Sequence, residues 1–530
     1  MLISLMIRLA APLSSVMPIN DGGLFYTMIE DLVTNHYRLP LTTTYNQAQI
    51  PFAYPPLALY AYALIMDLTG LSLLDLLRVL PTLISILTIP AFYFLAKEIL
   101  DSKVALLLAV AAFAFIPRSY IWLIMGGGAT RALGYLFALL AIRQTYRLFR
   151  SGHLKDALPA ILLSSLVVLS HPEAAFHTLL SSLFFYVWKD RSKTGFLHSL
   201  LVAGGVFITT APWWLMVTIR HGLDTLAAPA IAVSQDNISL LMRLFNLFIF
   251  RLTEEPFLNL FGVLGLIGIF ILLADRQFFI PIWLFILYII EPRSAPLYMM
   301  IPLAMGFGYG MEKIILPRLS GLDALHGSNQ GETTGSDRNL LLEGQIAKIF
   351  IGFLFAYGVM SNYYTGSQML SKFTLNDQDR DALAWAQTTS TDSRFLVITQ
   401  EKALLDPSSD WFPALAGRTS VGTVYGYEWV SDRQFDYRLT RARALQNCAT
   451  QGISCLDMWQ REYGETYDYV YIRKVQNGEL IQVPLIVDLR LSSQFEKVYE
   501  TNSVVIFERK PMELTSGRPQ SSPDGLSIIQ

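Results

Sequence analysis

Few side chains in this sequence could take part in chemistry, and those that could stand at the ends of apolar segments. Asp21 follows a short apolar opening segment, and Glu173 lies between two apolar segments with His171 and His177 beside it. A carboxylate at a dry boundary can take a proton from an attacking hydroxyl group. Because an acidic side chain at such an edge is costly without a partner or a task, Asp21 and Glu173 are the candidate catalytic residues.

Basic side chains lie close to the ends of other apolar segments. Arg118, Arg131 and Arg293 carry guanidinium groups, whose planar fork matches the oxygens of a phosphate group. Arg131 follows Gly126-Gly127-Gly128, a run that permits either close backbone approach or positive φ angles. We expect the three arginines to bind a phosphate-bearing substrate, with His171 assisting them.

The composition is that of a membrane protein. Of the 530 residues, 53% are hydrophobic and only 15% are charged, whereas a soluble protein carries about 25% charged residues. Apolar residues form long runs, for example 104–115, 157–169 and 263–274, and runs of about 17 to 25 residues can span a bilayer as helices. The net charge of −2 gives no indication of a nucleic-acid partner.

Lysine and arginine residues orient the chain in the membrane, because short cytoplasmic loops collect them. Three short connections do so, at 97–103, 143–155 and 189–193, and Asp275-Arg276 forms a fourth, weaker one. The segment 312–345 is rich in Gly, Ser and polar residues, which predicts a long flexible loop on the same side.

The alternation of spans then places the remaining turns on the outer face. They are the turn at 118–128, His171-Pro172-Glu173, Pro212-Trp213-Trp214 with the stretch to Pro256, and Glu291-Pro292-Arg293. A last span at 346–360 delivers the C-terminal region to the outside. The pattern predicts about eleven spans with a cytoplasmic N-terminus.

The first outer loop, 18–75, is long and partly apolar. Its segment 54–68 begins Tyr-Pro-Pro and contains Asp67, so it is a poor span. We predict that it is a helix lying in or dipping into the outer interface, and that 23–35 is a second such helix. A carboxylate, Asp21, therefore stands at the start of a structured outer loop.

The character of the chain changes after Ser371, where charged residues become frequent and apolar runs shrink to strand length. The pattern predicts a small extracytoplasmic α/β domain over 371–512 and a disordered Ser/Pro/Gly-rich tail over 513–530. The only cysteines, Cys448 and Cys455, form either a disulfide in an oxidising exterior or two free thiols. The expected strands are 395–398, 467–472 and 504–507, and the expected helices are 377–386 and 455–463.

The predicted fold class is thus a polytopic α-helical membrane module over 1–365 with a C-terminal α/β domain outside. All the candidate residues fall on the outer face, although the orientation used only Lys and Arg. A carboxylate base and phosphate-binding guanidinium groups suit transfer of a sugar from a phosphate-bearing lipid at membrane level to an acceptor that arrives from outside.

The order of these features resembles that of the GT-C glycosyltransferases, most similarly the branch of protein O-mannosyltransferases and aminoarabinose transferases. It covers residues 1–310 in layout and 1–100 in motif. The resemblance implies inverting transfer from a polyprenyl-phosphate sugar, with Asp21 at the catalytic carboxylate position and Tyr54 among the substrate-binding candidates. The motifs are Asn20-Asp21-Gly22-Gly23, Pro51-Phe52-Ala53-Tyr54-Pro55-Pro56-Leu57, Gly70 and Leu77-Arg78-Val79-Leu80-Pro81.

The sequence departs from that family in two places. Many members have two acidic residues in the first-loop motif, whereas Gly22-Gly23 follows Asp21 here. The outer loop at 118–128 contains no acid, where several relatives place one that binds metal or substrate. Metal use therefore stays open; carboxylate and imidazole groups can hold a divalent cation such as Mg or Mn, and Asp21, Glu173 and His171 are the candidate ligands.

A different class of function is the alternative: a transporter or flippase of lipid-linked sugars, or a membrane protein with an external sensing domain. Transporters often contain internal repeats and broken helices near the membrane midplane. The sequence shows no such repeat, and its candidate charges gather at one face. These two features favour the enzyme.

Overall fold

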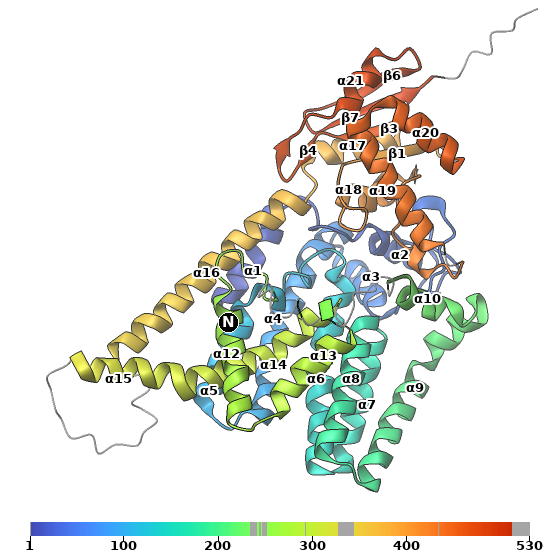
Figure 1. The fold of residues 1–530 in the computed structure, drawn as a ribbon. Coiled ribbons are helices and arrows are strands. Elements are labelled where there is room, and N and C mark those ends of the chain that lie inside the picture. Colours follow the sequence, from blue (N-terminus) through green and yellow to red (C-terminus); the bar gives the residue numbers. More distant parts are fainter. Residues whose placement is uncertain are drawn as a thin grey trace, which may run out of the picture.

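The structure, a computed structural model, describes residues 2–233, 241–242, 245, 252–291, 293–326, 344–432 and 434–510. Figure 1 shows a body of helices and, beside one end of it, a C-terminal domain with a sheet. The long helix α16 (Gln345–Phe373) leads from the body to that domain. The chain is therefore mostly helical with a C-terminal α/β part, as the sequence predicts.

The helical body is packed around α14 (Ala295–Gly310), which is buried along its whole length. Within the described residues, four stretches are long and apolar enough to cross a membrane: Leu73–Ile99, Lys193–His221, Ala295–Leu322 and Gln345–Gln387. Further apolar helices are shorter. The remaining body helices are α1 (Leu2–Ser14), α4 (Leu73–Ile99), α5 (Lys103–Phe115), α6 (Gly128–Ser151), α7 (Ala157–Val168), α8 (Pro172–Lys189), α9 (Lys193–His221), α10 (Asp224–Val233), α12 (Leu260–Ala274), α13 (Phe279–Ile290) and α15 (Leu316–His326).

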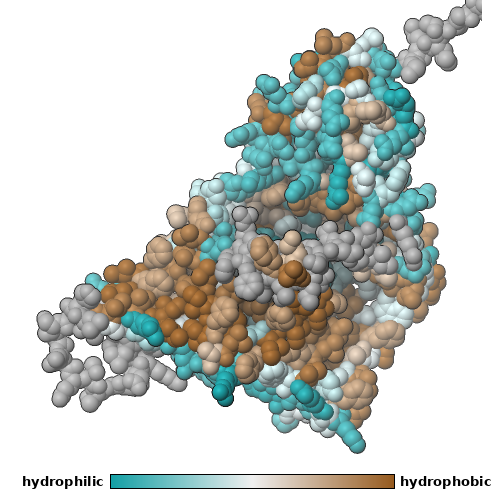
Figure 2. Space-filling model, in the orientation of Figure 1, coloured by the Kyte–Doolittle hydropathy of each residue, from teal (hydrophilic) through white to brown (hydrophobic). Residues whose placement is uncertain are grey.

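On the face shown in Figure 2, hydrophobic side chains cover much of the helical body, whereas the C-terminal domain carries many more hydrophilic ones. Helix α9 presents large apolar side chains on its surface: Ile208 is 70% exposed and Ile219 is 75% exposed. Side chains of this kind are stable against lipid and costly against water.

The prediction that Pro212-Trp213-Trp214 forms a turn is wrong, because the segment lies inside α9. Proline removes one backbone hydrogen bond, yet the helix continues to His221. The indole Nε1 of Trp214 donates to the carbonyl of Phe207 at 3.0 Å, which supplies a side-chain bond across the turn before the proline.

The prediction of a loop over 312–345 is wrong for its first part, which is helical. Residues Met311–Ile315 form a π-helical turn, and α15 continues to His326. Leu316 is buried, and Leu319 packs against the same core, so apolar spacing outweighs the polar composition in this segment. The middle of the predicted loop, 327–343, and the predicted disordered tail, 513–530, lie outside the described residues.

The C-terminal domain contains a five-stranded sheet of order β2-β1-β3-β7-β6. Strand β1 pairs in parallel with β2 and with the central strand β3, while β7 is antiparallel to β3 and β6. Helices α19, α20 and α21 cover one face of the sheet, and α17 and α18 cover the other. The elements are β1 (Arg394–Ile398), β2 (Thr419–Ser420), β3 (Tyr469–Arg473), β6 (Phe495–Glu500), β7 (Val504–Arg509), a β4–β5 hairpin (Val475–Gln476 and Glu479–Leu480), α17 (Asp377–Gln387), α18 (Pro407–Ala416), α19 (Phe435–Gln451), α20 (Ile453–Tyr463) and α21 (Pro484–Leu491).

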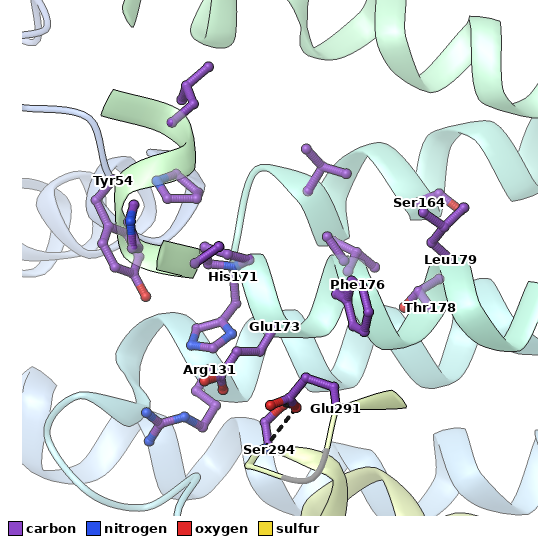
Figure 3. A pocket seen from close by; sticks show the side chains of 18 of the residues that line it. Tyr54, Arg131, Ser164, His171, Glu173, Phe176, Thr178, Leu179, Glu291 and Ser294 are labelled. Atoms are coloured by element: carbon purple, nitrogen blue, oxygen red, sulfur yellow. Dashed lines mark hydrogen bonds between the residues drawn. The ribbon is translucent and has the colours of Figure 1, made fainter. Parts of the chain in front are cut away.

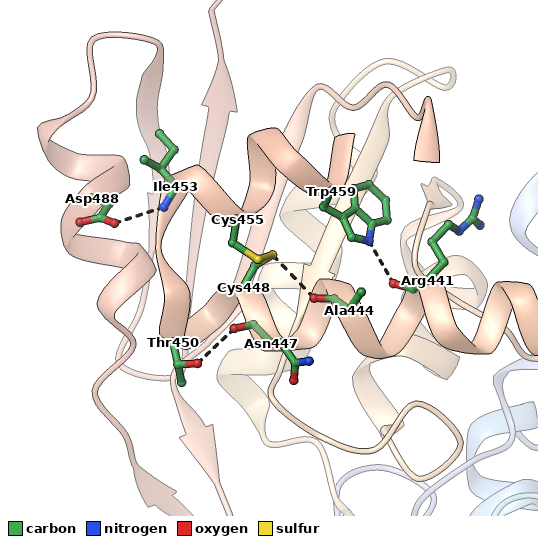
Figure 4. Close-up of a disulfide and its surroundings, with 9 residues drawn as sticks. All are labelled: Arg441, Ala444, Asn447, Cys448, Thr450, Ile453, Cys455, Trp459 and Asp488. Carbon is green, nitrogen blue, oxygen red and sulfur yellow. Dashed lines mark hydrogen bonds between the residues drawn. A yellow bond between two sulfur atoms is a disulfide. The ribbon is translucent and has the colours of Figure 1, made fainter. Parts of the chain in front are cut away.

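Cys448 on α19 and Cys455 on α20 form a disulfide, with 5.2 Å between their Cα atoms. Figure 4 shows the sulfur atoms bridging the ends of the two helices. The indole Nε1 of Trp459 also crosses from α20 to α19, donating to the carbonyl of Arg441 at 3.0 Å. Of the two alternatives that the sequence left open, the structure contains the disulfide.

The segment 18–75, for which the sequence predicts the first outer loop, folds against the C-terminal domain. It contains α2 (Gly23–Thr34) and α3 (Leu57–Thr69), at the positions where two loop helices are predicted. Met28 and Leu32 of α2 share one buried core with Trp411 and Phe412 of α18. The segment that begins at Asp21 is therefore held between the helical body and the C-terminal domain.

Candidate active site

A cavity of about 1720 Å³ lies where α6, α8 and α9 meet the first outer loop and the C-terminal domain. Its apolar part follows α8 and α9 and includes Phe176, Leu183 and Phe207. Its polar part contains all of the site residues predicted from the sequence, which were spread over four separate segments. They are Asp21, Tyr54, Arg118, Arg131, His171, Glu173 and Arg293.

Asp21 is held against the three-glycine run that precedes α6. The backbone N–H of Gly127 donates to its Oδ1 at 3.0 Å, and the N–H of Gly126 donates to the carbonyl of Ile19 at 2.8 Å. A Cβ atom on Gly127 would lie 2.4 Å from Oδ2 of Asp21. Of the two uses predicted for these glycines, close approach is therefore the one observed; none of the three has a positive φ.

Glu173, His171 and Arg131 lie together at the start of α8 and α6 (Figure 3). Pro172 occupies the first turn of α8 and Glu173 follows it, a placement that suits a helix N-terminus and its dipole. The guanidinium Nη1 of Arg131 donates to the carbonyl of Trp122 at 3.1 Å. This contact holds Arg131 at the cavity wall, where its charge acts on both Glu173 and Asp21.

His171 is buried and its Nδ1 has no hydrogen-bond partner within the described part of the chain. Burial, together with the positive charges of Arg131 and Arg293, holds the pKa of His171 well below its usual range. The imidazole is therefore neutral at physiological pH, and one of its nitrogens is free to face a bound group.

Arg118 is already paired in the structure. It forms an ion pair with Glu254, and the indole Nε1 of Trp122 donates to the same carboxylate at 3.2 Å. The guanidinium groups of Arg118 and Arg131 lie 5.4 Å and 6.0 Å from the centre of the Trp122 ring. Cation–π contact of this kind orders both arginines.

Tyr54 and Arg293 come from opposite sides of the cavity. The hydroxyl group of Tyr54 is 3.0 Å from Oγ1 of Thr130 on α6, and its ring packs 5.2 Å from that of Trp429 in the C-terminal domain. Arg293 is exposed, and its backbone N–H donates to Oε1 of Glu291 at 3.0 Å. The guanidinium group of Arg293 is thus available to a ligand.

Glu291 is a cavity residue that the sequence analysis did not single out by role. Its Oε2 accepts from the backbone N–H of Ser294 at 2.9 Å and lies 3.1 Å from Nε2 of His177. Hydrogen bonds from His177 and Ser294 outweigh burial and lower the pKa of Glu291 to about 2. Figure 3 shows Glu291 beside Ser294 and close to Glu173.

The C-terminal domain contributes carboxylates that sequence reasoning missed. Asp410 on α18 and Glu428 both line the cavity. Burial, and for Asp410 also the negative charge of Asp21, raises the pKa of each to about 7. No signal in the sequence links either residue to Asp21, because more than two thirds of the chain lies between them.

Asp21, Glu173 and His171 are the candidate metal ligands, and their use of a metal ion stays a prediction. Among the described residues, no group of three or more His, Cys, Asp or Glu side chains could hold a metal ion. Asp21 is engaged by a backbone N–H, and Glu173 faces a guanidinium group.

Solved structures match this fold, and those named below share 14% sequence identity with the chain. The apo oligosaccharyltransferase of Archaeoglobus fulgidus aligns with a TM-score of 0.56 and 14% identity over 89% of this chain and 68% of that chain. ArnT from Cupriavidus metallidurans, bound to undecaprenyl phosphate, aligns with a TM-score of 0.56 and 14% identity over 96% of both chains. The chain has the GT-C fold.

The arabinofuranosyltransferase AftD from Mycobacteria, at a TM-score of 0.52 and 14% identity, covers 96% of this chain but only 40% of its own length. No protein-family model and no curated protein sequence matches the chain. The resemblance to GT-C glycosyltransferases inferred from residues 1–100 is thus confirmed for the fold of the whole chain.

Proposed function

We propose that this GT-C chain is a glycosyltransferase that moves a sugar from a polyprenyl phosphate to an acceptor outside the membrane. One observation carries the proposal: the carboxylate of Asp21 is fixed in the wall of a cavity that also contains the guanidinium groups of Arg131 and Arg293 and continues into an apolar groove. A lipid-linked phosphate sugar needs these three environments together.

The donor would lie with its chain in the groove along α8 and α9. Phe176, Leu183 and Phe207 line this groove, and the solved ArnT structure holds undecaprenyl phosphate. The donor phosphate would meet Arg131 and Arg293, whose forks match its oxygens. The neutral imidazole of His171 can add an N–H donor without adding charge.

Asp21 would act as the general base. It takes the proton from the acceptor hydroxyl as that oxygen attacks the anomeric carbon from the face opposite the phosphate. The bond from the anomeric carbon to the phosphate oxygen breaks with its electron pair leaving on the phosphate, so the configuration inverts. Arg131 and Arg293 stabilise the charge that develops on the leaving phosphate, and Glu173 orients the acceptor and Arg131.

The membrane arrangement follows from the same proposal. The hydrophobic outside of the helical body (Figure 2) would lie in the bilayer with about eleven spans. The lysine and arginine connections would face the cytoplasm, and the C-terminal domain over 371–512 would lie on the outer side. The cavity then opens at the outer interface, where both lipid and acceptor have access.

The test is a transfer assay with purified protein in liposomes that contain polyprenyl-phosphate sugars. Asp21→Asn removes the base, and we expect the transfer rate to fall about 10²- to 10⁴-fold. Asp67→Asn is the matched control, because Asp67 lies in the same outer loop and bonds to Tyr37 away from the cavity. The proposal is wrong if no such donor supports transfer or if Asp21→Asn transfers at the wild-type rate; a chelator arm reports on metal use.

A further inference from the structure

The first turn of α2 is capped by a residue from the other end of the chain. Oδ2 of Asp410 accepts from the backbone N–H of Gly22 at 2.6 Å and from that of Gly23 at 2.7 Å, and Oδ1 lies 3.4 Å from the N–H of Leu24. Helix α2 has no side-chain cap of its own. A carboxylate at this position satisfies free N–H groups and complements the helix dipole.

The Asp410 carboxylate is itself fixed from its other side. The hydroxyl group of Tyr45 donates to the carbonyl of Asp410 at 2.8 Å and to its Oδ1 at 3.2 Å. The neighbouring indole Nε1 of Trp411 donates to the carbonyl of Asn20 at 2.9 Å. Helix α18 is therefore hydrogen-bonded to the residue before Asp21 and to the residue after it.

Because Gly22 and Gly23 have no side chains, α18 can approach their backbone closely enough for these hydrogen bonds. A Cβ atom on Gly23 would lie 2.2 Å from the carbonyl oxygen of Asp410, and one on Gly22 would lie 2.9 Å from the Trp411 ring. Gly22 also has a φ of 142°, a conformation that suits glycine. Side chains at positions 22 and 23 would occupy the space that α18 fills, so glycine is required at both positions.

Asp410 also brings a second carboxylate to Asp21. It is buried and lines the cavity, and the charge of Asp21 acts on it directly.

We propose that Asp410 is the positioning residue of the active site: it fixes the Asn20–Gly23 segment and thereby aims the carboxylate of Asp21. The inference rests on the proposed function, because Asp21 must act as the base for its aim to matter. It makes the C-terminal domain part of the catalytic machinery rather than only a binding module for the acceptor.

The kinetic test compares Asp410→Ala and Asp410→Asn with wild type. Alanine removes every cap contact, and we expect kcat to fall about 10- to 100-fold with the donor KM within twofold, because a misplaced base affects the reaction rather than donor binding. Asparagine keeps one oxygen for the N–H groups of Gly22 and Gly23 and should restore most of kcat. Asp432→Asn, on the exposed surface of the same domain, is the control.

A second measurement does not depend on activity. Hydrogen exchange at the amides of Gly22 and Gly23 should accelerate at least tenfold in Asp410→Ala and stay near wild type in Asp432→Asn. Unchanged exchange, or an alanine variant whose kcat stays within twofold of wild type, overturns the inference. If exchange accelerates but neither wild type nor control transfers sugar, the positioning contact stands and the proposed function is what fails.

Discussion

Gly127→Ala is the sharpest perturbation of the proposed site, because it adds one carbon atom against the base. The added Cβ would lie 2.4 Å from Oδ2 and 2.8 Å from Oδ1 of Asp21, whereas ordinary contact begins at 3.4 Å. The carboxylate must therefore retreat by about 1 Å, and its hydrogen bond from the N–H of Gly127 is strained. A misplacement of this size costs about 10²-fold in rate.

The same substitution should not weaken the fold through its backbone. Gly127 has φ −63° and ψ −11°, which alanine adopts readily, and alanine gains about 0.5–1 kcal/mol over glycine at a helical position. We therefore expect kcat to fall about 10²-fold while the thermal midpoint stays within a few degrees of wild type.

The assay measures sugar transfer in liposomes, with kcat and donor KM determined separately. Gly352→Ala in α16 is the matched control, since a Cβ there meets no atom within 4 Å, and it should transfer at the wild-type rate. A Gly127→Ala enzyme with kcat within threefold of wild type would refute the view that the position of Asp21 controls the reaction.

Three further predictions concern the donor, the pH and the disulfide. Arg131→Lys keeps the positive charge but loses the planar pair of N–H donors that matches a phosphate group. The donor KM should therefore rise about tenfold, while the acceptor KM stays unchanged. The pKa of Asp410 is about 7 in the folded protein and about 3.9 in the unfolded chain. Its contribution to the free energy of unfolding, about 4 kcal/mol, is therefore complete below pH 4 and is lost as the pH rises to 7. Between these pH values the thermal midpoint of Asp410→Asn should fall less than that of the wild-type protein. Cys448→Ser opens the loop to Cys455 and should cost about 2.5 kcal/mol, measured by denaturation with and without reductant.

The sequence was most informative where chemistry and local geometry coincide. Gly126-Gly127-Gly128 indicated close backbone approach, and the structure places Asp21 in the space those glycines leave. The two loop helices and the strands of the C-terminal domain were also predictable, because hydrophobic periodicity and turn residues are local signals. The cavity then collects all the predicted site residues.

Contacts between distant segments could not be predicted in this way. Asp410 reaches the cavity, and Glu254 reaches Arg118, from segments whose local pattern suggests only helix capping or a loop. The alternation of spans placed Pro212 in an outer turn, whereas it lies inside α9, which continues to His221. Pairing over such separations depends on packing that one sequence does not display.

The Asp410 cap joins positions 388 residues apart in the chain, and this has a consequence for biosynthesis. A ribosome that adds about 5–20 residues per second needs roughly 20–80 seconds to pass from Asp21 to Asp410. During that time the base is present in the nascent protein but has no partner to aim it. On the proposed function, the position of Asp21 is therefore fixed late, once the segment that contains Asp410 has been made, and a product that ends before Asp410 would lack the cap.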